Sequence, residues 1–187
     1  MNQVDSIDIV SCGVVDLGLP LLEEAGWVEF DRLPFLRYVE LSSLSTLYSD
    51  FVLRGLAALE MLNVSRLVSV GGDILFTAVK LAEVAFDSLA DVGDFSLVDS
   101  SAWHVTLPLL SEVANIDILN SSDLINLNLP RLSLVAGTLY FTALYFTTLY
   151  IPTLYNLPRL SLVAEEISLE GLVALQATYK VVTYKAK

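Results

Sequence analysis

The nonapeptide NLPRLSLVA occurs twice in this chain, at Asn128–Ala136 and again at Asn156–Ala164, so that the two copies begin 28 residues apart. No charged residue lies between Leu132 and Pro158. A copied phrase of this length indicates an internal repeat, and an internal repeat decides the fold class before any single motif does.

The repeat extends through most of the chain with a period of about 22 residues. Its marker is the residue that follows an apolar-x-apolar triplet, and successive markers lie 21 to 23 residues apart. The markers are Pro20, Ser42, Ser65, Asp87, Pro108, Pro130 and Pro152. The second nonapeptide places Pro158 six residues after the last marker, so we expect a lengthened final repeat with Ile167 and Leu169 as its next inward pair.

Apolar residues occupy fixed positions around each marker. Three residues before it stand Leu17, Val39, Leu62, Val84, Val105, Leu127 and Leu149, and two residues after it stand Leu22, Leu44, Leu67, Leu89, Leu110, Leu132 and Leu154. Farther on, pairs such as Ile74 and Phe76 lie two residues apart, which is the spacing of inward residues in a strand. Each repeat therefore predicts two short strands separated by a tight corner, often at a glycine such as Gly93.

A repeat this short cannot bury its own apolar side, so consecutive repeats must stack and cover one another. The sequence therefore predicts an all-β β-solenoid (β-helix) of about seven coils with repeats of about 22 residues. We expect one domain over residues 1–187, with an N-terminal cap at about 1–13, repeats at about 14–176 and a C-terminal capping strand at about 177–187.

A second rhythm leaves another coil shape open. Leucines recur every five residues at Leu119, Leu124, Leu129, Leu134, Leu139, Leu144, Leu149 and Leu154. This spacing resembles the pentapeptide-repeat proteins, which have a square coil. That family also has a small residue two positions before each central leucine, where this chain has Leu127 and Leu132.

Two repeat units carry a resemblance to a known family. Val64–Phe76 (VSRLVSVGGDILF) and Leu129–Phe141 (LPRLSLVAGTLYF) resemble turns of the receptor L domain, as in fungal cell-wall proteins and insulin-receptor-type ectodomains. The resemblance covers roughly residues 4–176. It implies a right-handed β-helix that binds other molecules through a flat face, without catalysis, at the cell surface or outside the cell.

Three features depart from that family. Met1 is followed by Asn-Gln-Val-Asp, so we expect no secretory signal at this start, and Cys12 is alone, so the cystines of the receptor examples are missing. Ordinary leucine-rich repeats would also have asparagine where Leu110 and Leu132 stand.

Composition excludes several function classes. The formal net charge of −12 argues against nucleic-acid and anionic-membrane partners, because both attract lysine and arginine. The uncharged run before Pro158 is long enough for a membrane span, but its five threonines, Pro152 and non-helical periodicity argue against one. The single Cys12 excludes a thiolate metal cluster. We expect neither a metal nor a cofactor.

Catalytic residues are not evident, and we expect no enzyme. His104, the one histidine, falls in the same repeat column as Glu83, where a general-base pair or a solvated polar ladder would fit. The carboxylate pairs Glu23-Glu24, Asp91/Asp94 and Glu165-Glu166 leave a polysaccharide-acting β-helix enzyme as a third hypothesis. The corner Gly71-Gly72-Asp73 lacks the rest of a phosphate loop and predicts a turn.

Partner-binding residues are predicted in the uncharged region. Tyr140, Tyr145, Tyr150 and Tyr155 each follow one of the five-spaced leucines, so they point outward if those leucines point inward. Exposed tyrosines are typical of surfaces that bind a protein or a glycan. The alternative is that the inserted segment folds over and buries them. A recognition scaffold that presents a flat strand face and these tyrosines is the favoured function.

The two ends of the chain differ in charge and support an alternative function. Asp5 and Asp8 precede the first basic residue, whereas Lys180 and Lys185 follow the last acid. Such charges either block association at open strand edges or guide head-to-tail stacking into filaments. The second hypothesis is therefore a self-assembling structural subunit.

Overall fold

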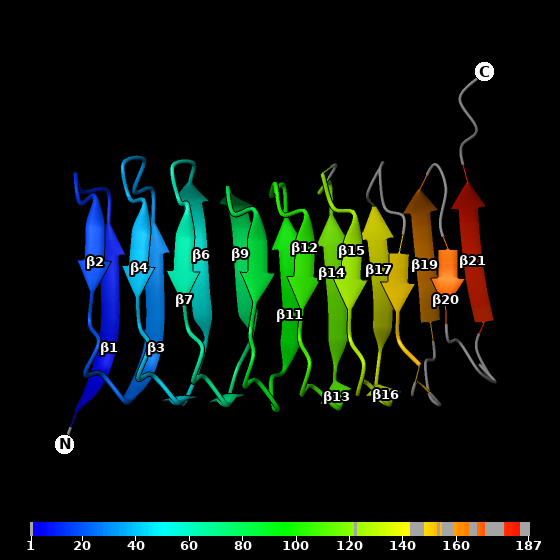
Figure 1. The fold of residues 1–187 in the computed structure, drawn as a ribbon, viewed down its shortest axis with the longest axis horizontal. Coiled ribbons are helices and arrows are strands. Elements are labelled where there is room, and N and C mark those ends of the chain that lie inside the picture. Colours follow the sequence, from blue (N-terminus) through cyan, green and yellow to red (C-terminus); the bar gives the residue numbers. More distant parts are fainter. Residues whose placement is uncertain are drawn as a thin grey trace.

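The computed structural model describes residues 2–121, 123–142, 148–152, 154, 159–164, 168–170 and 178–183, and in these ranges it is all-β (Figure 1). All strand pairs are parallel, and equivalent strands lie about 22 residues apart in the sequence. The predicted β-solenoid is confirmed. The described residues contain no helix, and hence none that could span a membrane.

A coil contains up to three strands, one more than the sequence predicts. The three-residue strands are β2 (Asp16–Gly18), β4 (Tyr38–Glu40), β7 (Met61–Asn63), β10 (Glu83–Ala85), β12 (His104–Thr106), β15 (Asn126–Asn128), β18 (Thr148–Tyr150) and β20 (Ser168–Glu170). The two-residue strands are β5 (Thr46–Leu47), β8 (Ser69–Val70), β13 (Glu112–Val113) and β16 (Leu134–Val135). The long strands are β1 (Gln3–Val10), β3 (Glu24–Asp31), β6 (Phe51–Leu56), β9 (Ile74–Val79), β11 (Asp94–Val98), β14 (Asn115–Leu119), β17 (Thr138–Thr142), β19 (Arg159–Ala164) and β21 (Thr178–Thr183).

The long strands and the three-residue strands stack into separate layers, as Figure 1 shows, whereas the two-residue strands β5 and β8 join the long sheet through β3 and β13 pairs with β16. The long strands form one sheet from β1 through β21. The three-residue strands form two separate sheets, β2-β4-β7 and β10-β12-β15-β18-β20. β21 lies inside the predicted capping strand, and β1 pairs with β3 as part of the long sheet.

Each marker residue from Pro20 through Pro130 is the second residue of a tight turn. The Leu22 amide donates to the Leu19 carbonyl at 3.2 Å, and the Leu132 amide donates to the Leu129 carbonyl at 3.2 Å. Proline is favoured at the second position of such turns because its fixed φ fits there. The period of the sequence is therefore a period of turns.

The second nonapeptide does not repeat the structure of the first. In the first copy Arg131 is in the turn and Leu134 begins β16, whereas residues 159–164 of the second copy form the long strand β19. Leu160 and Leu162 pair with Leu139 and Phe141 of β17. The predicted lengthened repeat is therefore wrong, because the long-sheet register continues at Leu160 rather than at Ile167.

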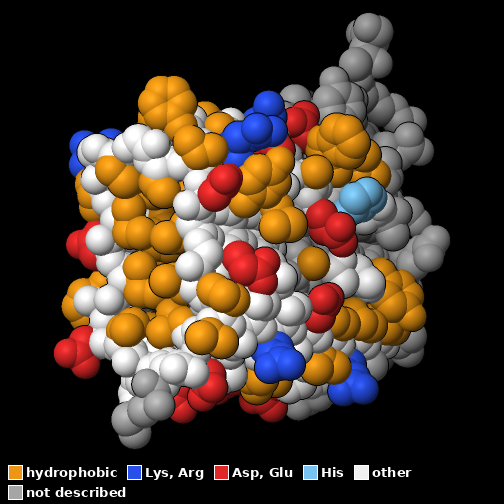
Figure 2. Space-filling model, turned by 60° about the vertical axis from the view of Figure 1, so that its left-hand side comes forward, with side chains coloured by type: hydrophobic (Ala, Val, Ile, Leu, Met, Phe, Trp, Pro, Cys, Tyr) orange, Lys and Arg blue, Asp and Glu red, His pale blue; other side chains and the backbone are white. Residues whose placement is uncertain are grey.

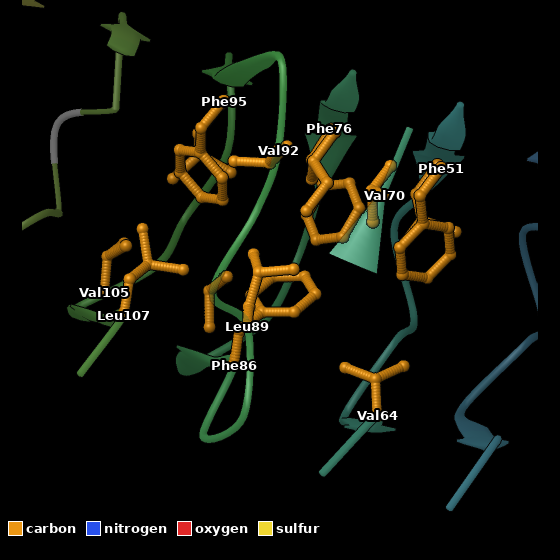
Figure 3. Close-up of a cluster of buried hydrophobic side chains, with 14 of the residues drawn as sticks. Phe51, Val64, Val70, Phe76, Phe86, Leu89, Val92, Phe95, Val105 and Leu107 are labelled. Carbon is orange, nitrogen blue, oxygen red and sulfur yellow. The ribbon is translucent and has the colours of Figure 1, made fainter. Parts of the chain in front are cut away.

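The predicted inward columns form the core. Val84, Val105 and Leu127 are at most 2% exposed and are directly in register with one another. The structure adds a column five residues after the marker, which the sequence analysis missed and which is buried throughout: Ala25, Leu47, Val70, Val92, Val113 and Val135. Phenylalanines fill the middle of the stack (Figure 3), with ring centroids 5.4 Å apart for Phe51 and Phe76 and 6.3 Å apart for Phe86 and Phe95.

A ladder of side chains links the corners before the long strands. Asp50 Oδ1 accepts the Asp73 amide at 2.9 Å, and Asp73 Oδ1 accepts the Asp94 amide at 2.8 Å. Asn115 Oδ1 continues the ladder by accepting the Thr138 amide at 2.8 Å. A Cβ atom at Gly93 would lie 2.6 Å from Asp73 Oδ1, so this glycine makes room for the carboxylate of the preceding coil.

Gly93→Ala is expected to destabilise the fold by about 1–3 kcal/mol, since the new methyl group must displace Asp73 or the Gly72 carbonyl 2.9 Å away. Gly18→Ala is the matched control, because nothing lies within 4 Å of a Cβ atom there. Urea denaturation measures both variants. Equal stability of the two variants would show that the ladder does not need this glycine.

Candidate functional site

The layer of three-residue strands is interrupted between β7 and β10. No strand pairing joins β7 to β10 within the continuous described range 2–121, although the long strands behind them stay paired through Val52 and Leu75. Figure 1 shows the wider spacing of this layer after β7. We name this interruption the β7–β10 opening.

A shortened corner accounts for the opening. Two residues separate Leu33 from Leu36, and the Leu36 amide donates to the Leu33 carbonyl at 3.2 Å. Leu56 and Leu59 repeat this turn at 3.3 Å. In the next coil only Lys80 separates Val79, which pairs with Leu56, from Leu81, so β10 leaves the corner one residue early.

A large side chain in the core acts in the same direction. Phe86 occupies the column that holds Leu41, Val64 and Leu107 in neighbouring coils. Its ring lies 6.1 Å from that of Phe76 and 6.4 Å from that of Phe51, measured between centroids (Figure 3). The ring fills the interior beneath the opening and leaves less room for β10 to approach β7.

The opening leaves backbone groups without the partners they have elsewhere. The Leu41 amide donates to the Asn63 carbonyl at 2.9 Å, and the Trp103 amide donates to the Ala82 carbonyl at 2.9 Å. Val64 is the equivalent of Leu41 and Ala82 the equivalent of Trp103 beside the opening, but their amides have no inter-coil partner among residues 2–121. Leu62 is only half-buried, whereas Val39 and Val84 of its column are buried.

A groove of about 510 Å³ lies at the corner beside the opening, and it is lined by Ala57, Ala58, Leu59, Glu60, Lys80 and Ala82. Glu60 Oε1 accepts a hydrogen bond from Arg37 Nη2 at 2.7 Å, and its Oε2 accepts one from the Tyr38 hydroxyl at 2.9 Å. These bonds lower the pKa of Glu60, with that from Arg37 contributing most. The groove therefore has a fixed anion and, at Lys80, a cation.

A second groove of about 410 Å³ lies over the strands that follow the opening, and it is lined by Glu83, His104, Thr106, Asn126, Leu127, Asn128 and Tyr150. Glu83 and His104 are in register, as their shared column predicts. Asn126 Nδ2 lies 3.0 Å from His104 Nδ1, so the histidine belongs to a ladder of polar side chains. Figure 2 shows this histidine at the surface among acidic and apolar side chains.

The predicted tyrosines do not share one sheet. Tyr150, 40% exposed, ends β18 in the three-residue layer and forms one wall of the second groove. Tyr140 lies half-buried on β17 in the long sheet. Tyr145 and Tyr155 lie outside the described residues. Tyr140 and Tyr150, which are two steps of the five-residue spacing apart, therefore lie on different sheets of the coil rather than along one face.

Tyr140 pairs in register with Asp117, whose carboxyl group lies partly buried on β14. Burial raises the pKa of Asp117, and the nearby Asp94 carboxylate adds to the rise. Because the folded chain keeps this proton at pH values where the unfolded chain has released it, folding stability falls as pH rises through that interval.

The other predicted residues lie apart from the grooves. Asp5 and Asp8 are exposed on β1, and Lys180 is in β21, whereas Lys185 lies outside the described residues. Glu24 accepts a hydrogen bond from the Tyr48 hydroxyl at 2.7 Å, and Asp94 accepts one from Asn115 at 2.9 Å. Glu165 and Glu166 lie outside the described residues, and the described part of the chain holds no cluster of three potential metal ligands.

The β7–β10 opening escaped the sequence analysis. Its one signal in the sequence is that one residue, rather than two, separates Val79 from Leu81. The spacings between markers hide this difference because they vary by one residue throughout the chain. The exposed Trp103, the residue that precedes β12, was also missed.

Hydrogen exchange should detect the opening. The amides of Val64 and Ala82 are expected to exchange about tenfold faster than those of Leu41 and Trp103, because only the latter pair donate to a neighbouring coil. NMR-detected exchange measures this comparison in one sample. Equal protection at the four positions would mean that β7 and β10 pair in solution.

Asp117→Asn is expected to raise Tm slightly at pH 7, since it removes a carboxylate that the fold disfavours. The gain should shrink as the pH falls below the ordinary aspartate pKa, where both states hold the proton. Thermal denaturation across pH 3–7 measures it. Asp91→Asn, at an exposed corner, is the control, and a gain that does not change with pH would contradict this account.

Comparison of the chain with family models, curated proteins and solved structures finds no match. The fold therefore rests on the period of the sequence and on the parallel ladders. The resemblance to the receptor L domain stays a prediction.

Proposed function

We propose that this chain is a non-catalytic recognition scaffold that binds an extended segment of a partner protein. The segment would enter the β7–β10 opening and continue over the second groove. The observation that supports the proposal most directly is the open ladder, because it offers strand edges in the middle of the stack rather than at its ends.

An extended segment matches the groups that the opening leaves unpaired. Peptides commonly add to a sheet by hydrogen-bonding their main chain to an exposed strand edge. The Val64 and Ala82 amides are the donors available here, and the Glu60 carbonyl lacks an inter-coil partner in the described range 2–121. The half-buried Leu62 supplies an apolar contact.

The walls of the opening favour one direction for the segment. Ala57, Ala58 and Ala82 are small, so the main chain of a partner can approach closely. Glu60 is held as an anion by Arg37 and Tyr38, and the Lys80 charge acts on Glu60 without forming an ion pair in the described chain. A segment with a basic residue near Glu60 and an acidic residue near Lys80 would complement both charges.

The second groove would supply selectivity. Glu83, His104 and Asn126 present one row of polar side chains, and Thr106 and Asn128 a second row. Tyr150 adds a half-exposed ring with few rotatable bonds, which is a common contact at protein interfaces. These side chains would contact residues of the partner beyond the part that occupies the opening.

A peptide array and a glycan array are the probes that test this proposal. Peptides of mixed charge are expected to bind, and Ala82→Trp is expected to weaken binding about tenfold or more by filling the opening. Ala90→Trp places the same side chain at an exposed corner outside both grooves and should leave binding unchanged.

Two results would contradict the proposal. Unchanged peptide affinity of Ala82→Trp would remove the opening as the site. Binding of glycans alone, lost in Tyr150→Ser with the fold intact by circular dichroism, would assign recognition to the second groove and to a carbohydrate partner.

A further inference from the structure

The first coil leaves part of the apolar interior uncovered. Five apolar residues of this coil are only partly buried: Ile7, Ile9, Val14, Leu17 and Leu19. By contrast, Val28 and Phe30, which pair in register with Ile7 and Ile9, are fully buried. An apolar-lined hollow of about 390 Å³ opens beside β1, with Val4, Leu19 and Leu21 among its walls. Figure 2 shows apolar side chains gathered at this end of the molecule, with acidic side chains around them.

The strands β1 and β21 lie at opposite ends of the described part of the same sheet. β1 pairs with β3 alone, and β21 pairs with β19 alone, among the strands described. All strands of this sheet run in the same direction. A second copy translated along the stack could therefore place its β1 on β21 as one more parallel strand.

Residues that pair in register across successive strands form rows, and the rows that start on β1 end on β21. The row that starts at Asp8 passes through Glu29, Val52, Leu75, Ser96, Asp117, Tyr140 and Ser161 and ends at Lys180. Traced through the same ladders, the rows of Ile7 and Ile9 end at Tyr179 and Val181. Continuing the register thus sets an acid opposite a base, between two rows that are apolar at both ends.

Charge at the first coil favours this partner. Asp8 is exposed and next in register to Glu29, whose carboxylate already pairs with Arg54 at 2.8 Å. Arg54 therefore pairs with Glu29 rather than with Asp8, and within the described chain no cation pairs with Asp8. Lys180 of a second copy would supply that cation.

We propose that copies of this chain stack head to tail, with β21 of one copy pairing with β1 of the next and Lys180 opposite Asp8. Such a contact joins two different surfaces, so it leaves both ends of the assembly open and builds filaments rather than closed pairs. The proposal does not depend on the recognition function, because neither groove lies at the contact.

Charge reversal tests this pairing. The wild-type chain is expected to show concentration-dependent assembly in sedimentation velocity at low salt, and Asp8→Lys or Lys180→Asp alone is expected to weaken it about tenfold or more. An equimolar mixture of the two variants should assemble again, because each contact between unlike copies then joins opposite charges. The mixture also shows that both variants are folded.

Glu112→Lys is the matched control, since it makes the same charge change on the exposed face of β13 and should assemble as the wild type does. A wild-type chain that stays monomeric at every concentration would overturn the proposal. Single variants that assemble normally, or a mixture that fails to assemble, would overturn it as well.

Discussion

Stacking of like positions in parallel register is the constraint on which the rest of the structure depends. A coil of three short strands has no interior of its own, so Val84 is buried because Val105 lies over it and Val105 because Leu127 does. Burying each such side chain contributes about 1.5–3 kcal/mol before the cost of ordering the chain is counted. Stability in this architecture therefore comes chiefly from the contacts between neighbouring coils.

The register is held by polar groups as well as by the core. The ladder from Asp50 through Asp73 and Asp94 to Asn115 links the corner of each coil to the next, and it requires glycine wherever a Cβ atom would occupy the place of the carboxylate. Where a strand layer lacks a described neighbour, apolar and backbone groups are left uncovered together. In the described chain this is so at the first coil and at the β7–β10 opening, and these places carry the two proposed surfaces.

The two copies of the nonapeptide show that an identical local sequence can adopt two different structures. One copy of RLSLVA contains a turn residue and the whole of the two-residue strand β16, and the other copy is the six-residue strand β19 of the long sheet. The same six residues therefore fit either a turn followed by a short strand or one longer strand. Pairing of Leu160 with Leu139 decides the second case, and that pairing is a tertiary contact.

The sequence by itself determined the class of the fold, the period and most of the inward columns, because these depend on chemistry repeated every 22 residues or so. It also placed Glu83 beside His104, since like positions stack. Only the tertiary structure decided that the β7–β10 ladder is open, that Tyr140 and Tyr150 lie on different sheets, and that Asp8 shares a row with Lys180. The tyrosines are separated because β17 and β18 belong to different sheets of one coil. The open ladder and the Asp8 row depend on the register accumulated across many coils, where a corner shorter by one residue or a larger ring in the core shifts a strand without disturbing the period.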